Sequence, residues 1–98
     1  MHRYYKLKMK FGKDILYGRF KLEINKNNIK GTIEYKNIKT SFKDGILKDN
    51  NIEFSGNFKI FFSKVNYIAK GYIDDEKISI IATTNRGDFE INGIREKE

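Results

Sequence analysis

The chain has 98 residues with a net charge of +7, and it contains no cysteine and no proline. This length is enough for one small core, so residues 1–98 are expected to form a single domain, with residues 96–98 as a frayed tail. The lack of cysteine excludes disulfides, Cys-ligated zinc and thiol nucleophiles. The single histidine, His2, leaves no basis for a His-ligated metal or a Ser-His-Asp triad.

The positive charge comes mainly from lysine, which supplies 16 of the 20 basic residues. Isoleucine, asparagine and lysine together make 41 of the 98 residues, a bias that A/T-rich coding produces without selection for an anionic partner. Arginine, which forms the forked contacts to phosphates and bases, occurs four times. Residues 1–10 lack the apolar stretch of an export signal, so a cytoplasmic protein is expected.

Apolar and polar residues alternate along most of the chain, the pattern of strands with one buried face. In chain order, the alternating segments are residues 5–11, 19–25, 29–36, 38–43, 52–62, 65–73, 78–84 and 89–93. No segment has the i, i+3, i+4, i+7 spacing of an amphipathic helix. The sequence therefore predicts an all-β fold of about eight strands.

The joints between these segments are short and polar. Residues 25–28, 48–51 and 74–77 each place four polar side chains between two aliphatic ones, which is typical of tight hairpins. Shorter turns are expected at residues 12–14, 63–64 and 86–88, and Asp44-Gly45 reads as a bulge within a strand. Short connections make neighbouring strands antiparallel, so the chain is predicted to meander.

Such a meander can bury its apolar face by closing into a barrel or by folding into a sandwich. An up-and-down β-barrel is favoured, because closure removes the exposed edges and because small residues among bulky ones suit tight curvature. The residues predicted to point inward include bulky Phe11, Phe20, Phe42, Phe54, Phe58, Phe62 and Phe89 and small Gly31, Gly56, Ala69, Gly71, Ala82 and Gly93.

Several turn and strand signatures resemble those of a known barrel family. They are Gly18-Arg-Phe-Lys-Leu, Ile29-Lys-Gly-Thr-Ile, Phe42-Lys-Asp-Gly45, Asn51-Ile-Glu-Phe, Tyr67-Ile-Ala-Lys-Gly71, Asp75-Glu-Lys-Ile78, Gly87-Asp-Phe89 and Gly93-Ile-Arg95. Between about residues 16 and 95 the chain thus resembles the short lipocalin-like, calycin-type barrel domains of bacteria. These occur alone or appended to larger enzymes such as flavin-dependent reductases. Ser79-Ile80-Ile81 replaces a Gly-Thr-Ala-type step, and the resemblance implies a fold without a settled activity or cofactor.

One functional interpretation is a small apolar or planar ligand inside the barrel. Hydroxyl groups predicted to point inward could orient it, namely those of Tyr5, Tyr35, Tyr67, Thr40 and Thr84. The alternative is that these hydroxyls bond to backbone or water at the barrel ends while phenylalanine rings fill the middle.

A second interpretation is association through the outer face of the strands at residues 52–62, 65–73 and 78–84. Four apolar residues are expected to face solvent there: Phe61, Ile68, Tyr72 and Ile81. With turns centred at residues 63–64 and 75–76, Phe61 would lie opposite Asn66, and Lys70 opposite Ile81. A clustered patch favours a homodimer or protein partner, whereas scattered surface hydrophobes need no explanation.

Nucleic acid is a weaker alternative. Basic residues on the outer face of the first hairpin lie beside Tyr4, as in single-strand binders, and they are Arg3, Lys6, Lys8, Lys10, Arg19 and Lys21. Lysines that alternate along a strand are more often a solvated face that protects an edge.

No catalytic residue, metal site or cofactor is predicted. General acid–base catalysis needs a tuned pair near a bound substrate, but the glutamates fall on outward positions and the aspartates in turns. The acidic turn at residues 74–76 lacks the spacing of a calcium loop. The sequence is therefore interpreted as a non-enzymatic binding module, acting through the outer face or, alternatively, through the barrel interior.

Overall fold

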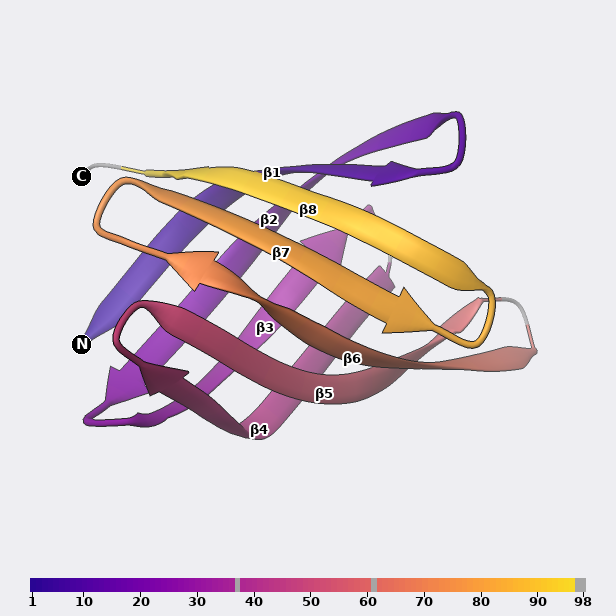
Figure 1. Cartoon of the computed structure of the whole chain (residues 1–98). Coiled ribbons are helices and arrows are strands. Elements are labelled where there is room, and N and C mark those ends of the chain that lie inside the picture. The colour runs from indigo at the N-terminus through magenta and orange to yellow at the C-terminus, as the bar shows by residue number, and fades with distance from the viewer. Residues whose placement is uncertain (37, 61, 97–98) are drawn as a thin grey trace.

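A computed structural model describes residues 1–36, 38–60 and 62–96, with only the backbone of Ile60. The described residues form eight strands: β1 (His2–Phe11), β2 (Asp14–Asn25), β3 (Asn28–Tyr35), β4 (Ile38–Lys48), β5 (Asn51–Ile60), β6 (Ser63–Ile73), β7 (Lys77–Thr84) and β8 (Gly87–Arg95). Each strand pairs antiparallel with the next, and β1 also pairs with β8, from Tyr5 opposite Arg95 to Lys10 opposite Glu90. The sheet is therefore closed (Figure 1), which confirms the predicted up-and-down barrel over the sandwich.

Turn chemistry explains the hairpins at one end of the barrel. In the β2–β3 turn Lys26 has φ of 60°, and in the β4–β5 turn Asp49 and Asn50 have φ of 51° and 71°. Asparagine and aspartate tolerate this left-handed region better than other non-glycine residues, which accounts for Asp49 and Asn50 but not for Lys26. The bulge predicted at Asp44-Gly45 is also present, because Asp44 has φ of 60° and the β3–β4 register shifts between Ile29 and Gly31.

The β5–β6 hairpin turns earlier than predicted. Ile60 pairs with Ser63, so residues 63–64 belong to β6, and Asn57 rather than Phe61 lies opposite Asn66. As a consequence Phe62, predicted to point inward, is fully exposed. The alternation of apolar residues continues through this turn, so the sequence pattern does not mark where the chain reverses. Phe61 itself lies outside the described residues.

The strands of the first hairpin and the last strand are longer than predicted. β2 begins at Asp14, because Phe11 pairs with Asp14 and the ladder then runs to His2 opposite Glu23. Of the tail expected at residues 96–98, Glu96 has hydrogen-bond partners, and residues 97–98 lie outside the described residues. The Glu96 amide donates to the carbonyl oxygen of Tyr4 at 2.7 Å, and its carboxylate accepts from Arg19 at 2.7 Å.

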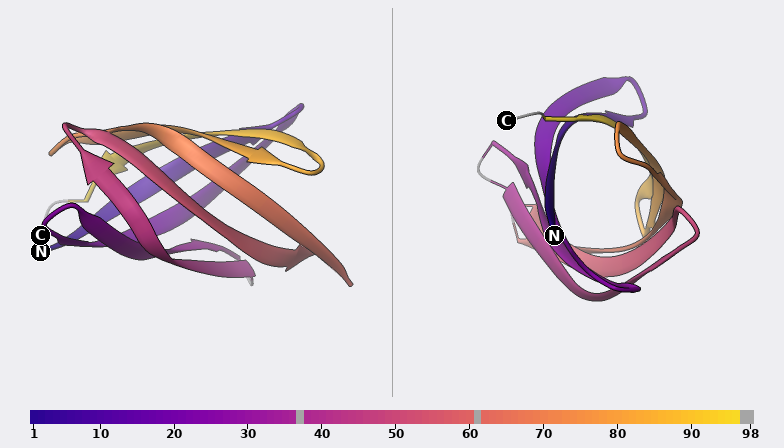
Figure 2. Two further views of the ribbon diagram at one scale, coloured as in Figure 1. Left: turned by 60° about the horizontal axis from the view of Figure 1, so that its bottom comes forward. Right: turned by 90° about the vertical axis from the view of Figure 1, so that its left-hand side faces the viewer.

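The two ends of the barrel are filled differently. The right-hand view of Figure 2 looks onto the end of the barrel that holds both termini. At this end large side chains are fully buried, including Leu22, Ile52, Ile73 and Ile78. In the middle, the rings of Phe42 and Phe54 stack with centroids 4.0 Å apart, and the Phe20 ring lies 5.8 Å from that of Phe54. This aromatic plug, defined by Phe20, Phe42 and Phe54, closes the barrel from the termini side.

Candidate ligand-binding cavity

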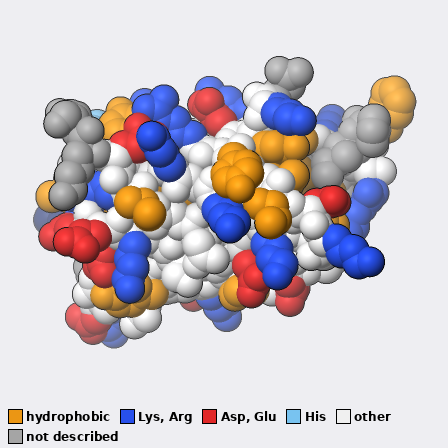
Figure 3. Space-filling model, turned by 90° about the horizontal axis from the view of Figure 1, so that it is seen from above, with side chains coloured by type: hydrophobic (Ala, Val, Ile, Leu, Met, Phe, Trp, Pro, Cys, Tyr) orange, Lys and Arg blue, Asp and Glu red, His pale blue; other side chains and the backbone are white. Residues whose placement is uncertain are grey.

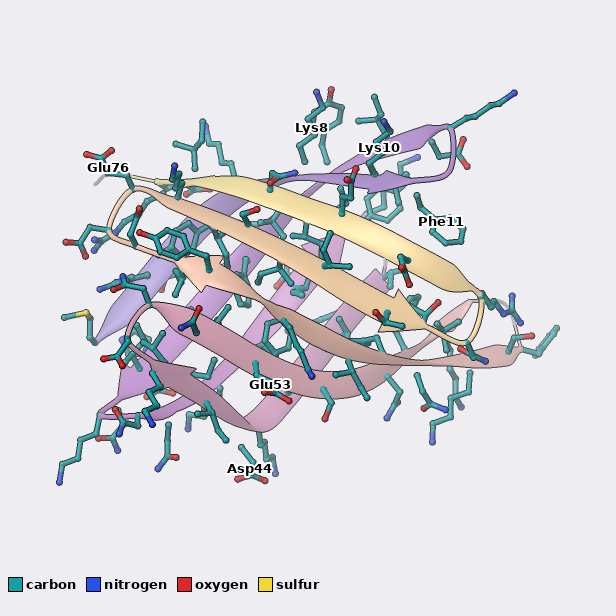
Figure 4. All side chains as sticks on the ribbon, viewed as in Figure 1. Lys8, Lys10, Phe11, Asp44, Glu53 and Glu76 are labelled. Carbon is teal, nitrogen blue, oxygen red and sulfur yellow. The ribbon has the colours of Figure 1, made fainter. Side chains whose placement is uncertain are left out.

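Beyond the aromatic plug, the other end of the barrel is hollow. A cavity of about 360 Å³ lies there, within the size range of small-molecule sites. Its walls are mostly aliphatic and aromatic, and the exposed residues Asp14 and Arg86 lie at its rim. Figure 4 shows Phe11, which lines the cavity, at the end of the barrel opposite Glu76 in the β6–β7 turn.

The cavity follows from the strand directions. The β1–β2, β3–β4, β5–β6 and β7–β8 hairpins all turn at this end, so each strand contributes its inward residues nearest that turn. The lining residues are Met9, Phe11, Asp14, Leu16, Ile33, Tyr35, Ile38, Thr40, Phe58, Val65, Tyr67, Ala82, Thr84, Arg86, Phe89 and Ile91. All eight strands therefore contribute, with Arg86 added from the β7–β8 turn.

Aromatic rings form part of the cavity wall. The Phe11 and Phe89 rings stack with centroids 4.3 Å apart, and the Phe58 ring meets Phe89 edge-on at 6.4 Å. Phe58 also lies 6.2 Å from the Tyr67 ring. Rings in such tilted and edge-on arrangements present both faces and edges, to which a planar ligand can pack.

A pair of hydroxyl groups interrupts this apolar wall. Thr40 Oγ1 donates to the carbonyl oxygen of Asn57 at 2.8 Å and lies 3.3 Å from the hydroxyl of Tyr67. Burial raises the pKa of the Tyr67 phenol above its ordinary value. The phenol therefore stays protonated at neutral pH and has one hydrogen to donate.

Gly56 makes room for the Tyr67 hydroxyl. A Cβ atom built at Gly56 would lie 2.6 Å from the hydroxyl oxygen and 3.0 Å from the ring carbon that bears it. Contacts this short force one group to move. Glycine at this position, directly opposite Tyr67 in the β5–β6 ladder, thus sets where the phenol sits.

Four of the five hydroxyl residues predicted for a ligand line the cavity: Tyr35, Thr40, Tyr67 and Thr84. The Thr84 hydroxyl is already used in its own turn, donating to the Gly87 carbonyl at 2.6 Å and accepting from the Arg86 amide at 2.9 Å. Tyr5 does not reach the cavity, which corrects that part of the prediction. Its hydroxyl donates to the Asp74 carbonyl at the opposite end, because Tyr5 lies near the start of β1.

Sequence reasoning identified most of the apolar lining as inward but did not group it as a site. Phe58, Phe89, Val65 and Ile91 follow the same period-two pattern as the residues at the closed end of the barrel, and they differ from those in lying close to this set of turns. The sequence signal that could have grouped these residues is their short distance along the chain from the four hairpin turns at this end of the barrel. The rim residue Asp14 is predicted in a turn, whereas in the structure it begins β2.

The outer face predicted as an interface is formed in part. Ile68, Tyr72 and Ile81 are exposed by 53%, 42% and 45%, and Ile81 pairs with Lys70, which lies between Ile68 and Tyr72 on β6. We call Ile68, Lys70, Tyr72 and Ile81 the β6–β7 outer patch. The Tyr72 hydroxyl is bound to Asp74 at 3.1 Å.

The basic first hairpin also has its own ion pairs. Arg3 contacts Asp75 at 3.0 Å and Arg19 contacts Glu96 at 2.7 Å, while Arg19 and Lys21 lie over the Tyr4 ring at 5.7 and 6.0 Å. Figure 3, seen from the side of this hairpin, shows hydrophobic side chains spread between Lys and Arg side chains. Lys8 and Lys10 project away from the barrel (Figure 4).

Among the described residues, no three His, Cys, Asp or Glu side chains come together in a way that could hold a metal ion. Within the same residues, no helix is long and apolar enough to cross a membrane.

Comparison with known proteins supports the fold alone. No protein-family model matches the chain, and no curated protein matches it significantly. Among solved structures, the chain is similar to a redesigned β-barrel, with a TM-score of 0.67 and 10% sequence identity over 97% of this chain and 89% of that one. At this level of identity the similarity is one of architecture, that of a small closed β-barrel.

Proposed function

We propose that this chain is a non-enzymatic binding module that holds one small, mostly apolar, planar ligand in the open end of its barrel. The observation that carries the proposal is the 360 Å³ cavity, walled by phenylalanine rings and carrying one buried hydroxyl pair. Specific small-molecule sites combine these features, with apolar walls for affinity and a few polar groups for orientation. Within this proposal, the resemblance to bacterial lipocalin-like, calycin-type domains and a cytoplasmic location stay predictions.

Native mass spectrometry of protein purified without refolding tests the proposal directly. A mass surplus that survives gentle desolvation supports it, and that mass begins to identify the ligand. For protein that carries no surplus, titration with naphthalene followed by amide NMR shifts is the second test. Shifts confined to the hollow end of the barrel support the proposal, whereas a clean chain mass together with no naphthalene shifts overturns it.

A matched pair of variants on β7 separates cavity binding from surface adsorption. Ala82 lines the cavity, and its neighbour Thr83 points outward. Ala82→Leu adds a side chain inside the cavity and should weaken naphthalene binding at least tenfold. Thr83→Leu adds the same side chain outside and should leave binding unchanged. Equal effects of the two variants contradict binding in the cavity.

The second candidate is self-association through the β6–β7 outer patch. A two-fold interface brings the same surface of two copies together, so a face that carries both charge signs can complement itself. Lys70 in the patch lies 4.0 Å from Glu53 on the neighbouring β5, and the exposed Ile68 and Ile81 supply apolar area beside this pair. A second copy of the chain is thus the partner proposed for this face. Nucleic-acid binding by the first hairpin is less favoured, since both of its arginines are already paired with carboxylates.

A further inference from the structure

The donors and acceptors around Thr40 and Tyr67 define the hydrogen-bonding character of the cavity. The hydroxyl of Thr40 has one hydrogen, and the carbonyl oxygen of Asn57, 2.8 Å away, can only accept. The Thr40 hydrogen is therefore directed to Asn57. The remaining contact, 3.3 Å between Thr40 Oγ1 and the Tyr67 hydroxyl, is then made by the Tyr67 hydrogen.

This assignment leaves the Tyr67 oxygen as an acceptor with no hydrogen to give. A phenol carries one hydrogen and can also accept, and the Tyr67 hydrogen is already directed to Thr40. Within the described residues, Thr40 is the hydrogen-bond partner of this oxygen, and the Thr40 hydrogen is directed to Asn57. A ligand that donates a hydrogen bond to such an acceptor in an apolar pocket gains binding free energy. A ligand without a donor leaves the acceptor unpaired, which costs binding free energy.

On the basis of the proposed function, we infer that the ligand is a neutral planar molecule with an aromatic N–H or O–H group, which it donates to the Tyr67 oxygen. Phe58 and Phe89 pack against its ring system. Neutrality follows from the lining, because the ionisable side chains Asp14 and Arg86 lie at the rim with opposite charges, and a charged group beside Tyr67 would have no partner. Tyr67 thus sets ligand orientation, with Thr40 and Gly56 as positioning residues.

Indole and benzofuran test this inference, because the two molecules share size and planar shape while only indole carries an N–H. Without an acceptor in the cavity, indole should bind more weakly than benzofuran, since its N–H would lose its bond to water. With the Tyr67 oxygen as acceptor, indole should bind about fivefold to tenfold more tightly, as measured by NMR titration. Equal affinities, or a preference for benzofuran, overturn the inference and leave the proposed function standing.

Variants assign the preference to the hydroxyl pair. Tyr67→Phe keeps the ring and should abolish the preference for indole while changing benzofuran affinity less than twofold. Thr40→Val frees the Tyr67 hydrogen and should reduce the preference, whereas Thr40→Ser should retain it. Tyr17→Phe, on the outer face of β2, is the matched control and should change neither affinity. A preference that survives Tyr67→Phe contradicts the inference. If neither molecule produces shifts in the cavity, the proposed function fails, and the inference fails with it.

Discussion

The hydroxyl group of Tyr5 donates a hydrogen bond to the backbone carbonyl oxygen of Asp74, 3.0 Å away, and links the first strand to the β6–β7 turn. The Tyr5 side chain is fully buried, so it adds both packing and a satisfied polar group at the end of the barrel with the termini. The same turn is organised by the Asp74 carboxylate, which accepts from the amides of Glu76 and Lys77 at 2.8 Å each. This closed end, with the aromatic plug above it, confines the hollow to the opposite end.

Tyr5→Phe should therefore lower the free energy of unfolding by about 1 kcal/mol, because it leaves the Asp74 carbonyl without its donor. Urea unfolding followed by circular dichroism measures the change. Indole and benzofuran affinities should stay as they are, since Tyr5 lies beyond the plug. Tyr17→Phe at an exposed position is the control and should have no effect. A loss of binding in Tyr5→Phe would mean that the two ends of the barrel are coupled.

Alkaline stability should depend on the two buried phenols. Burial raises the pKa of both Tyr5 and Tyr67 above the ordinary value of 10.0. Below that value the phenols are protonated in both the folded and the unfolded chain, and their contribution to stability is complete. As the pH rises further, the unfolded chain loses these protons first, so stability falls until the folded-state pKa values are passed.

The measurement is a set of unfolding curves between about pH 9 and pH 12. The double variant Tyr5→Phe, Tyr67→Phe should show a shallower fall of stability with pH than the unchanged chain, even if it is less stable at pH 9. A fall of equal slope in both proteins would assign alkaline unfolding to other groups.

The plug and the cavity wall should respond differently to loss of a ring. Phe54→Ala removes a ring that is 3% exposed and stacked on Phe42, and it should cost about 3–5 kcal/mol of unfolding free energy. Phe58→Ala removes a half-buried ring from the cavity wall and should cost about 1–2 kcal/mol. Chemical denaturation of the two variants compares these losses directly. A greater loss for Phe58 would mean that the hollow end is packed rather than open.

Self-association should respond to the β6–β7 outer patch and not to the cavity. Ile81→Lys places a charge beside Lys70 and should convert any dimer to monomer in light scattering over a range of protein concentration. Ile94→Lys, on the exposed outer face of β8, is the matched control for adding a lysine to the surface. A chain that is monomeric at every concentration before substitution removes this candidate.

Much of the fold follows from residues that are close in sequence. The alternation through Leu7 and Met9, or through Ile78, Ile80 and Ala82, assigns each of these side chains to the inside, and all of them are buried. Polar turns set antiparallel order between neighbours, and Asp44-Gly45 marks a bulge. Local pattern failed at the β5–β6 hairpin, where apolar residues run through the reversal and left Phe62 assigned to the interior.

The division of the interior between plug and cavity required the tertiary structure. Phe54 and Phe58 follow the same alternation on one strand, yet one is in the aromatic plug and the other faces the hollow. Whether the Phe54 or the Phe58 ring is tightly packed depends on inward side chains of strands that are not its neighbours. These side chains come together only when the barrel closes by pairing of β1 with β8. The same holds for the two tyrosines, since Tyr5 and Tyr67 are both inward but lie toward opposite ends.

The sequence by itself thus determined the strands, their antiparallel order and the inward face, because period-two patterning and turn residues act over a few positions along the chain. Closure of the barrel, the location of the cavity and the pairing of Thr40 with Tyr67 were decided by the tertiary structure. These depend on register and tilt summed around eight strands, and side chains 27 residues apart are brought within hydrogen-bonding distance only by that closed geometry.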